Sequence, residues 1–191
     1  ALLRSDGRAA AFGSSACGQC DVPEPPPGTS YCAVEASNDF TVLVRSDGRV
    51  VVCGEDLAGP RKIPEPEEGV RYVQAALGCE HTVLLRSDGR AEAYGRNTYL
   101  QCSIPAVEER VGYAQVAAGS FHTVLLCSDG RVAACGSNRS GQCSLPRRQR
   151  GVRYCQVSAG SQHTVLLRTD GRAVAVGRRE EGQCDIPEPE P

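Results

Sequence analysis

The chain has 191 residues, of which 40% are hydrophobic and 23% charged, as is typical of folded globular domains. Its formal net charge of −2 argues against a nucleic-acid-binding protein that relies on overall basicity. The sequence has no run of about 18 apolar residues, so it predicts no membrane-spanning helix.

The sequence repeats itself with a period of 41 residues. The tetrapeptide Ser-Asp-Gly-Arg, with Thr for Ser in its last copy, begins at Ser5, Ser46, Ser87, Ser128 and Thr169. Glycine, proline, tyrosine and histidine landmarks keep the same phase without an insertion or deletion. The chain holds about 4.7 such units, and a period of this size indicates a repeat architecture.

One unit, followed from its tyrosine, predicts a series of short β-strands. Residues 113–118, 122–126 and 131–135 are runs rich in apolar and β-branched side chains. Asp129-Gly130 separates the second run from the third, and this dipeptide predicts a hairpin with a type I′ turn. Residues 142–145 are a candidate fourth strand. Glycine and proline recur too often for helices of ordinary length, so we expect three firm strands per unit.

Each unit needs its neighbours to bury its strands. Residues 82–85 and 164–167 both read Thr-Val-Leu-Leu, as expected of a strand covered on both faces. A short all-β unit with a hairpin fits a blade of a β-propeller, in which small sheets pack radially against one another. We therefore predict an all-β fold, a β-propeller of about 4.7 blades. A β-solenoid is the alternative, although its coils are usually shorter and lack a regular hairpin.

The whole chain, residues 1–191, is predicted to be a single propeller segment. Counted from the histidine position, the repeats span residues 1–39 (partial), 40–80, 81–121, 122–162 and 163–191 (partial). The sequence enters at the second strand of a unit and ends before the next tyrosine strand is due. An open blade would expose a strand edge and an apolar face, so we expect the natural protein to contain further units.

The repeat resembles that of the regulator of chromosome condensation (RCC) family. Residues 163–172 read His-Thr-Val-Leu-Leu-Arg-Thr-Asp-Gly-Arg, and Gly182-Gln183-Cys184 follows; residues 136–142 read Gly-Ser-Asn-Arg-Ser-Gly-Gln. These match the family's His-Thr-x-x-Leu, Asp-Gly and Gly-x-Asn-x-x-Gly-Gln pattern. The resemblance implies that the chain is part of a seven-bladed ring. The short unit is similar to those of the β-lactamase-inhibitory propeller and of HERC-type ubiquitin ligases.

The chain departs from the family pattern in two places. It lacks tryptophan, which the family often places just before the second glycine of the unit, and this argues against the ultraviolet-photoreceptor branch. Gly59-Pro60-Arg61 replaces Gly-Gln-Cys in the second unit.

The cysteines and histidines are predicted to be structural. Cys17 and Cys20 form a Cys-x-x-Cys, but no second such pair exists to complete a zinc site. Most other cysteines recur in phase, which places the copies on different blades and disfavours disulfides. His81, His122 and His163 are expected to cap backbone at the start of their strands.

We predict no catalytic residue, cofactor or metal site. Reduced thiols favour the cytoplasm, with the nucleus as the alternative, although a leader before residue 1 would leave secretion open.

Recognition is predicted to lie in the loops, which vary between units while the strands repeat nearly verbatim. The variable stretches are the loop after the recurring proline, residues 97–100 and 138–140, and the turn at 120–121. Aromatic and arginine side chains dominate the energetics of protein interfaces. The candidate partner-binding residues are Tyr99, Phe121, Arg139, Arg147, Arg148, Arg150 and Arg153. The alternative for the arginine cluster is a solvated charged loop.

The sequence favours a non-catalytic protein–protein interaction module that presents variable loops to a protein partner, with nucleic acid and membrane disfavoured. It contains no phosphate-binding loop, nucleophile elbow or zinc-protease motif. Two alternatives rest on the family resemblance alone. One is the substrate- or regulator-binding region of a HECT-type E3 ubiquitin ligase, whose thioester cysteine would lie outside this chain. The other is a guanine-nucleotide exchange factor for a small GTPase.

Overall fold

The computed structural model describes residues 1–54, 63–146 and 151–187. Within these residues the chain forms fourteen β-strands and no helix, so the prediction of an all-β fold is confirmed. Twelve of these strands form four three-stranded antiparallel sheets, and the other two form a hairpin. The antiparallel pairing and the stacking of separate sheets exclude the β-solenoid alternative.

Each three-stranded sheet is one blade and begins at a tyrosine. The first strands are β3 (Tyr31–Ala36), β6 (Tyr72–Leu77), β9 (Tyr113–Ala118) and β12 (Tyr154–Ala159). The second strands are β4 (Phe40–Arg45), β7 (His81–Arg86), β10 (His122–Cys127) and β13 (His163–Arg168). The third strands are β5 (Val50–Gly54), β8 (Ala91–Gly95), β11 (Val132–Gly136) and β14 (Ala173–Gly177). The hairpin at the N-terminus is β1 (Leu2–Leu3) with β2 (Ala9–Ala10). A period counted from the histidine therefore holds two strands of one blade and the first strand of the next.

The hairpin between the second and third strands differs from the predicted type I′ turn. Gly130 has a φ of +81°, but Asp129 is not among the residues with positive φ, as a type I′ turn would require. The Gly130 amide donates to the Cys127 carbonyl oxygen (2.9 Å), and the Cys127 amide donates to that of Arg131 (2.8 Å). Ser128, Asp129 and Gly130 therefore form a three-residue loop, a type I turn closed by a left-handed glycine. The prediction was wrong because it counted only the Asp-Gly pair as the loop.

The candidate fourth strand at residues 142–145 is not a strand. The Ser144 amide donates to the Gly141 carbonyl oxygen (3.0 Å), and the Leu145 amide donates to that of Cys143 (2.9 Å). Because these donors are used within the turn itself, they are not available to a sheet. Within the part of the chain that the structure describes, each of the four blades therefore has three strands.

The second strand of each blade forms its core. Every residue of β7 and of β10 is buried, and Leu84, Leu125 and Leu166 are completely inaccessible to solvent. Alternate side chains of β10 point to opposite neighbours: Leu125 packs in a cluster with β6, β7 and β9, whereas Val124 packs in a cluster with β12 and β13. The prediction of cover on both faces is confirmed for residues 82–85, which lie in β7. In β13 only Thr164 and Leu166 are buried, so residues 164–167 are fully covered on one face alone.

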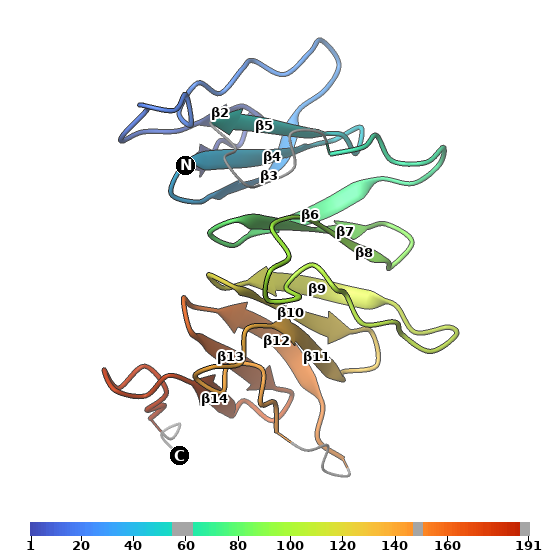
Figure 1. The fold of residues 1–191 in the computed structure, drawn as a ribbon. Coiled ribbons are helices and arrows are strands. Elements are labelled where there is room, and N and C mark those ends of the chain that lie inside the picture. The colour runs from blue at the N-terminus through green and yellow to red at the C-terminus, as the bar shows by residue number, and fades with distance from the viewer. Residues whose placement is uncertain (55–62, 147–150, 188–191) are drawn as a thin grey trace.

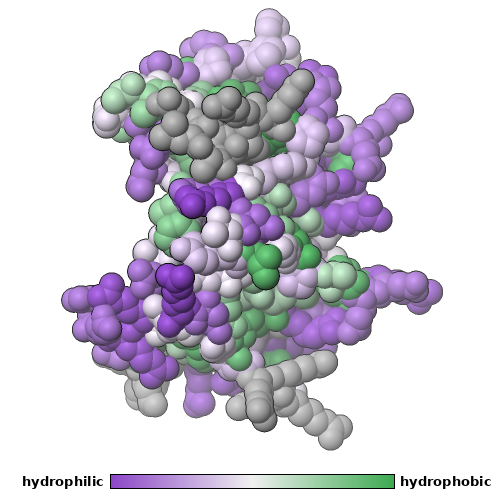
Figure 2. All heavy atoms as spheres, viewed as in Figure 1, coloured by the Kyte–Doolittle hydropathy of each residue, from purple (hydrophilic) through white to green (hydrophobic). Residues whose placement is uncertain are grey.

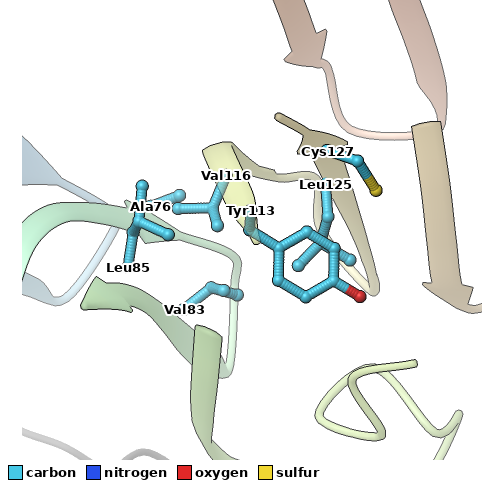
Figure 3. Packing of buried hydrophobic residues seen from close by; sticks show 7 residues of the cluster. All are labelled: Ala76, Val83, Leu85, Tyr113, Val116, Leu125 and Cys127. Atoms are coloured by element: carbon cyan, nitrogen blue, oxygen red, sulfur yellow. The ribbon is translucent and has the colours of Figure 1, made fainter. Parts of the chain in front are cut away.

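The blades stack in chain order, one sheet against the next (Figure 1). Figure 3 shows how Val83 and Leu85 of β7 approach Tyr113 and Val116 of β9, so that one apolar cluster closes the contact between two blades. Figure 2 shows the outcome at the surface, with apolar side chains gathered over the middle of the visible face and hydrophilic side chains dominating its periphery. The sheets therefore form a regular scaffold that carries its loops at both ends of the strands.

Candidate interaction surface at the turn end of the blades

The strands end in two different sets of loops. At one end, here called the turn end, lie the short turns between first and second strands and the loops that follow the third strands. They are in contact: the Arg96 amide donates to the Glu80 carbonyl oxygen (2.8 Å), and the Ser137 amide donates to that of Phe121 (2.8 Å). At the other end, here called the hairpin end, lie the Asp-Gly hairpins and the segments that lead into the next tyrosine. The chain therefore offers two separate surfaces to a partner.

A row of polar side chains locks one blade to the next near the turn end. His81 Nε2 lies 3.0 Å from Oγ1 of Thr123 in the following blade, and Thr123 Oγ1 lies 2.8 Å from the Gln101 carbonyl oxygen. A threonine hydroxyl has one proton, which here goes to the carbonyl oxygen, so His81 donates through Nε2–H. Gln101 belongs to the loop after β8, and the lock therefore joins a strand and a loop of one blade to the second strand of the next.

The same lock recurs one blade further on. His122 Nε2 lies 3.0 Å from Oγ1 of Thr164, which donates to the Gln142 carbonyl oxygen at 2.8 Å. Both histidines therefore bridge blades. The prediction that their side chains cap backbone at the start of their own strands is wrong, because the ring nitrogen reaches past its own blade.

The first pair of blades lacks the polar lock. Phe40 stands in the histidine position and is buried in an apolar cluster with Val42, Tyr72 and Leu84. Oγ1 of Thr82, the counterpart of Thr123, is buried and has no hydrogen-bond partner among the described residues. Apolar packing therefore takes the place of a hydrogen bond at this contact.

Burial sets the protonation state of the bridging histidines. Desolvation, with a smaller contribution from the histidine of the next blade, lowers the pKa of His81 to about 4 and that of His122 to about 4. Both rings are therefore neutral at pH 7. Each ring also lies against a glycine, and a Cβ at Gly78 or Gly119 would overlap it. Glycine is required at these two turns because of its size.

Glutamine side chains connect the first strands of neighbouring blades. The Val116 amide donates to Gln74 Oε1 (3.1 Å), and Gln74 Nε2 donates to the Val116 carbonyl oxygen (3.0 Å). Gln115 and Val157 make the same pair of bonds at the next contact, at 3.1 and 2.9 Å. The first strand is the edge of its sheet, so some of its backbone groups have no neighbouring strand to pair with. The glutamine side-chain amides form hydrogen bonds with these groups.

The loop after each third strand is fixed by its own side chains. In residues 137–144, Gln142 Oε1 accepts the Ser140 amide (2.9 Å), Asn138 Oδ1 accepts the Cys143 amide (2.9 Å), and the Cys143 thiol donates to the Ser137 carbonyl oxygen (3.3 Å). Asn, Gln and Cys of the repeat motif thus each hold one part of the loop.

The preceding blade builds the same loop from residues 96–103. Gln101 Oε1 accepts the Tyr99 amide (2.9 Å), Asn97 Oδ1 accepts the Cys102 amide (2.8 Å), and the Cys102 thiol donates to the Arg96 carbonyl oxygen (3.4 Å). The residues between these anchors are left to vary.

The cysteine of this motif acts as a thiol donor in four repeats. Cys20, Cys102, Cys143 and Cys184 each lie 3.1–3.4 Å from a carbonyl oxygen six residues earlier, and none of these four is in a disulfide. Burial raises the pKa of Cys143 to about 11, so this thiol keeps its proton at neutral pH. The structural role predicted for the in-phase cysteines is confirmed for these positions.

Three of the predicted partner-binding residues come together at the turn end. The ring centroids of Tyr99 and Phe121 are 5.4 Å apart in an edge-to-face arrangement with an interplanar angle of 62°. The guanidinium carbon of Arg139 lies 5.1 Å from the centroid of the Tyr99 ring. Both are favourable geometries. Tyr99 follows β8, Phe121 lies between β9 and β10, and Arg139 follows β11, so two neighbouring blades contribute.

Of the remaining predicted residues, the structure describes Arg153, which does not join this group. Arg153 is exposed at the hairpin end, where its side chain lies beside Gly130 of the preceding blade. Arg147, Arg148 and Arg150 lie outside the described residues. The predicted set therefore includes residues from both ends of the blades.

Leu100 belongs to the turn-end group but was not predicted. Its side chain is 63% exposed, and its φ of +65° is left-handed. The other repeats have glycine here, and the described ones, Gly18, Gly141 and Gly182, have φ of 78°, 82° and 76°. A left-handed conformation costs a residue with a Cβ about 1–2 kcal/mol. The sequence holds the signal, since Leu100 alone breaks a column of glycines at the 41-residue period.

One blade contains an ionic cluster around a buried arginine. The Arg86 guanidinium lies 2.6 Å from Glu92, 2.8 Å from Asp88 and 3.3 Å from Glu67, and its own side chain is almost completely buried. The hydrogen bonds that the Arg86 guanidinium donates to Glu92 and then to Asp88 raise the pKa of Arg86 above its usual value. The hydroxyl groups of Tyr72 and Tyr94 also donate to Glu92. These groups satisfy one another, so the cluster is a structural element of the blade.

Within residues 1–54, 63–146 and 151–187, no group of three or more His, Cys, Asp and Glu side chains is arranged to hold a metal ion. A search of the same described residues for helices long and apolar enough to cross a membrane found none.

These features define a class of protein, a repeat β-propeller whose blades are joined by polar side-chain locks. The model of the regulator of chromosome condensation (RCC1) repeat matches residues 113–142 and 154–183. Each matched segment runs from the tyrosine that opens a blade to the glutamine that fixes its loop. These two segments are therefore similar to RCC1-type repeats, as the resemblance implied, and they lie in a chain that folds as a repeat β-propeller.

Solved structures with this fold are similar over nearly the whole chain. The ectodomain of the Physcomitrella patens receptor kinase CR4 matches with a TM-score of 0.76 and 18% identity, covering 97% of this chain and 52% of that one. Yeast RCC1 (Prp20), solved bound to Kap60, matches with a TM-score of 0.79 and 18% identity over 97% and 55%. Human WBSCR16 matches with a TM-score of 0.71 and 17% identity over 92% and 58%.

At these identities the likeness shows the fold alone. The chain spans about half the length of the solved proteins that it matches. A search among curated proteins finds no match.

Proposed function

We propose that this chain is a protein-interaction module whose turn end binds a protein partner. One observation carries the proposal: the loops after β8 and β11 have the same Asn, Gln and Cys hydrogen bonds, yet they expose different side chains. A fixed backbone with variable exposed residues is the usual basis of recognition by loops on a rigid scaffold.

Structural neighbours support a partner of this kind. Prp20p from Saccharomyces cerevisiae, which matches with a TM-score of 0.71 and 21% identity, was described with its binding to Gsp1p and histones, and yeast RCC1 was solved bound to Kap60. A protein rather than a nucleic acid is the partner we propose here. Two arginines of the turn end, Arg96 and Arg178, are paired with Glu80 and Glu180, which weakens their attraction for a phosphate backbone.

The proposal is tested by locating the contact. The full 191-residue chain is used to capture a protein from an extract of the cells that express it, and the purified pair is compared with the free chain by hydrogen–deuterium exchange. Protection at residues 96–103, 119–121 and 137–144 is the expected result. Protection confined to the hairpin end, or no protein captured beyond a tag-only control, would overturn the proposal.

Two finer functions stay predictions. A role as the substrate- or regulator-binding arm of a HECT-type ubiquitin ligase would be established by ubiquitin transfer by the full-length protein. A role in nucleotide exchange would be established by stimulated release of guanine nucleotide from a small GTPase by this chain.

We also propose that the protein works in a reducing compartment, the cytoplasm or alternatively the nucleus. Cys20, Cys102, Cys143 and Cys184 support this, because oxidation would remove a hydrogen bond from each loop. Alkylation of thiols in intact cells, followed by mass spectrometry, should find these four positions reduced. Disulfides at these positions would contradict the proposal.

A further inference from the structure

We propose that Tyr99, Leu100, Phe121 and Arg139, together called the Leu100 patch, form a docking site for a peptide segment of another protein. The segment presents an apolar side chain next to a carboxylate. This inference rests on the proposed function and adds the chemistry of the partner.

The backbone at Leu100 is the first reason. The Leu100 amide donates to the Asn97 carbonyl oxygen at 3.1 Å, and the Gly141 amide donates to that of Asn138 at the same distance one blade later. Leucine therefore gives this turn no bond that glycine would not give. It instead places an apolar side chain, 63% exposed, on a left-handed backbone that disfavours it. A strained residue where glycine would form the same turn without strain points to a functional site.

The neighbours of Leu100 are the second reason. Tyr99 stands where the other repeats have Cys17, Ala58, Ser140 and Glu181. Phe121 stands where they have Asp39, Glu80 and Gln162. Two aromatic residues and a leucine thus replace small, polar or charged residues at one junction between blades. Leu100 is exposed, and Tyr99 and Phe121 are each partly exposed. A group of accessible apolar side chains marks an interaction site more often than scattered single residues do.

The charge of the patch indicates what it would bind. Arg139 is exposed and lies over the Tyr99 ring, and it forms no ion pair with the described residues. Arg96 and Arg178, on the same end of the blades, are both paired with glutamates. Arg139 is therefore available to pair with a carboxylate of a ligand whose apolar side chain contacts Leu100 and the aromatic rings.

The patch is already held in place in the free chain. The Tyr99 amide donates to Gln101 Oε1 (2.9 Å), and the Phe121 carbonyl oxygen accepts the Ser137 amide (2.8 Å). Both loops are thus fixed by hydrogen bonds before a ligand arrives, which reduces the ordering that binding requires.

The test uses a library of random dodecapeptides displayed on phage and selected on the immobilised 191-residue chain. Enriched peptides are then synthesised with a fluorescent label, and their dissociation constants are measured by fluorescence anisotropy. We expect peptides with Asp or Glu next to an aliphatic or aromatic residue. Leu100→Gly and Arg139→Glu should each weaken binding by about tenfold or more, as loss of a central contact does. Arg153→Glu, an exposed arginine at the hairpin end, is the matched control and should leave binding unchanged.

Exchanging the charges of the peptide and of residue 139 tests whether the two form an ion pair, as distinct from a general loss of affinity. Replacing the acidic residue of a selected peptide with Lys should weaken binding to the parent chain and restore it to Arg139→Glu. Leu100→Gly restores the residue of the other repeats, so its thermal midpoint should not fall below that of the parent. Weak binding by this variant would then reflect the lost side chain and not misfolding.

Several outcomes would overturn the docking site. These are no enriched peptide, enriched peptides without the acidic and apolar pair, or equal binding by the parent, Leu100→Gly and Arg139→Glu. A dimer in sedimentation velocity that Leu100→Gly dissociates would assign the patch to contacts between copies of this chain instead. If the captured cellular partner binds Leu100→Gly and Arg139→Glu as tightly as the parent, the proposed function stands and the docking site fails.

Discussion

The loops at residues 96–103 and 137–144 occupy the same place on consecutive blades and are built alike, yet they differ at the surface. Asn97, Gln101 and Cys102 in the first loop make the hydrogen bonds that their counterparts make in the second. Between these anchors, the first loop has a partly buried Tyr99 and an exposed Leu100, and the second has Ser140 and Gly141. The difference lies entirely in side chains that the backbone does not depend on.

The comparison teaches how this repeat separates stability from recognition. The glutamines that hold the loops and the histidines that lock the blades are buried, and they recur at the 41-residue period. Positions between them contribute little to the fold, so one junction can acquire an aromatic and apolar surface without a change of architecture. Variants that remove the shared framework should affect both loops, and variants of the exposed positions should affect one.

The largest effect should come from the core beneath both loops. Leu125 is completely buried in the cluster between two blades. Leu125→Ala should lower the free energy of unfolding by about 2–5 kcal/mol, through lost burial and the cavity that remains. Urea unfolding followed by circular dichroism measures it. A loss below about 0.5 kcal/mol, the size of a surface substitution, would contradict the blade assignment.

The second effect concerns pH and the locks between blades. The folded-state pKa of His81 and of His122 is about 4, below the value of about 6.5 expected in the unfolded chain. The unfolded chain therefore takes up protons first as the pH falls. Stability from each histidine is complete above about pH 6.5 and is lost on the way down to about pH 4, in total roughly 3 kcal/mol each.

A natural substitution provides the control for this effect. Phe40 fills the histidine position in the first blade, so His122→Phe copies a side chain that the scaffold already accepts. Unfolding free energies measured at several pH values between 4 and 7 should fall about half as far for this variant over the window. If His122→Phe keeps the full pH dependence, the buried neutral histidine is not its source.

The next effect should distinguish the two loops from each other. Gln101→Ala removes the acceptor of the Tyr99 amide, and Gln142→Ala removes the acceptor of the Ser140 amide. Each should cost about 1–2 kcal/mol, since a buried hydrogen bond is lost. Hydrogen–deuterium exchange should increase in residues 96–103 for the first variant and in residues 137–144 for the second. Faster exchange in both loops for either variant would show that the loops are not held independently.

The fold could be predicted from the sequence because period and hydrophobic pattern record it directly. The 41-residue phase places the tyrosine, histidine and glycine columns, and the run Thr-Val-Leu-Leu indicates a strand buried on both faces. The lock between His81 and Thr123 was not predictable in this way. It joins residues that are 42 positions apart, and only the packing of blades brings them together. The same holds for Gln74 and Val116.

The candidate site could be predicted only in part, because the sequence does not show how the loops are arranged in space. Tyr99, Phe121 and Arg139 were found as exceptions to the repeat, but sequence alone could not say which variable loops share an end of the blades. Arg153 was therefore grouped with them although it lies at the hairpin end. Leu100 was not predicted because the candidates were chosen among aromatic and arginine residues, and leucine is neither. Leu100 is unusual because it has a left-handed backbone, the conformation that the described glycines have at the same position of the other repeats.

The smallest effect on stability should come from exchanging leucine and glycine at the equivalent positions of the two loops. Leu100→Gly should raise the free energy of unfolding by about 0.5–1 kcal/mol, because relief of the left-handed conformation exceeds the entropy cost of glycine. Gly141→Leu should lower it by a similar amount. A Cβ at Gly141 would meet Ser144 Oγ at 3.8 Å, an ordinary contact, so conformation and not overlap causes the loss. Thermal unfolding of the two variants beside the parent measures both changes. If Leu100→Gly instead destabilises the chain, the leucine contributes to the fold, and its exposure no longer argues for a partner.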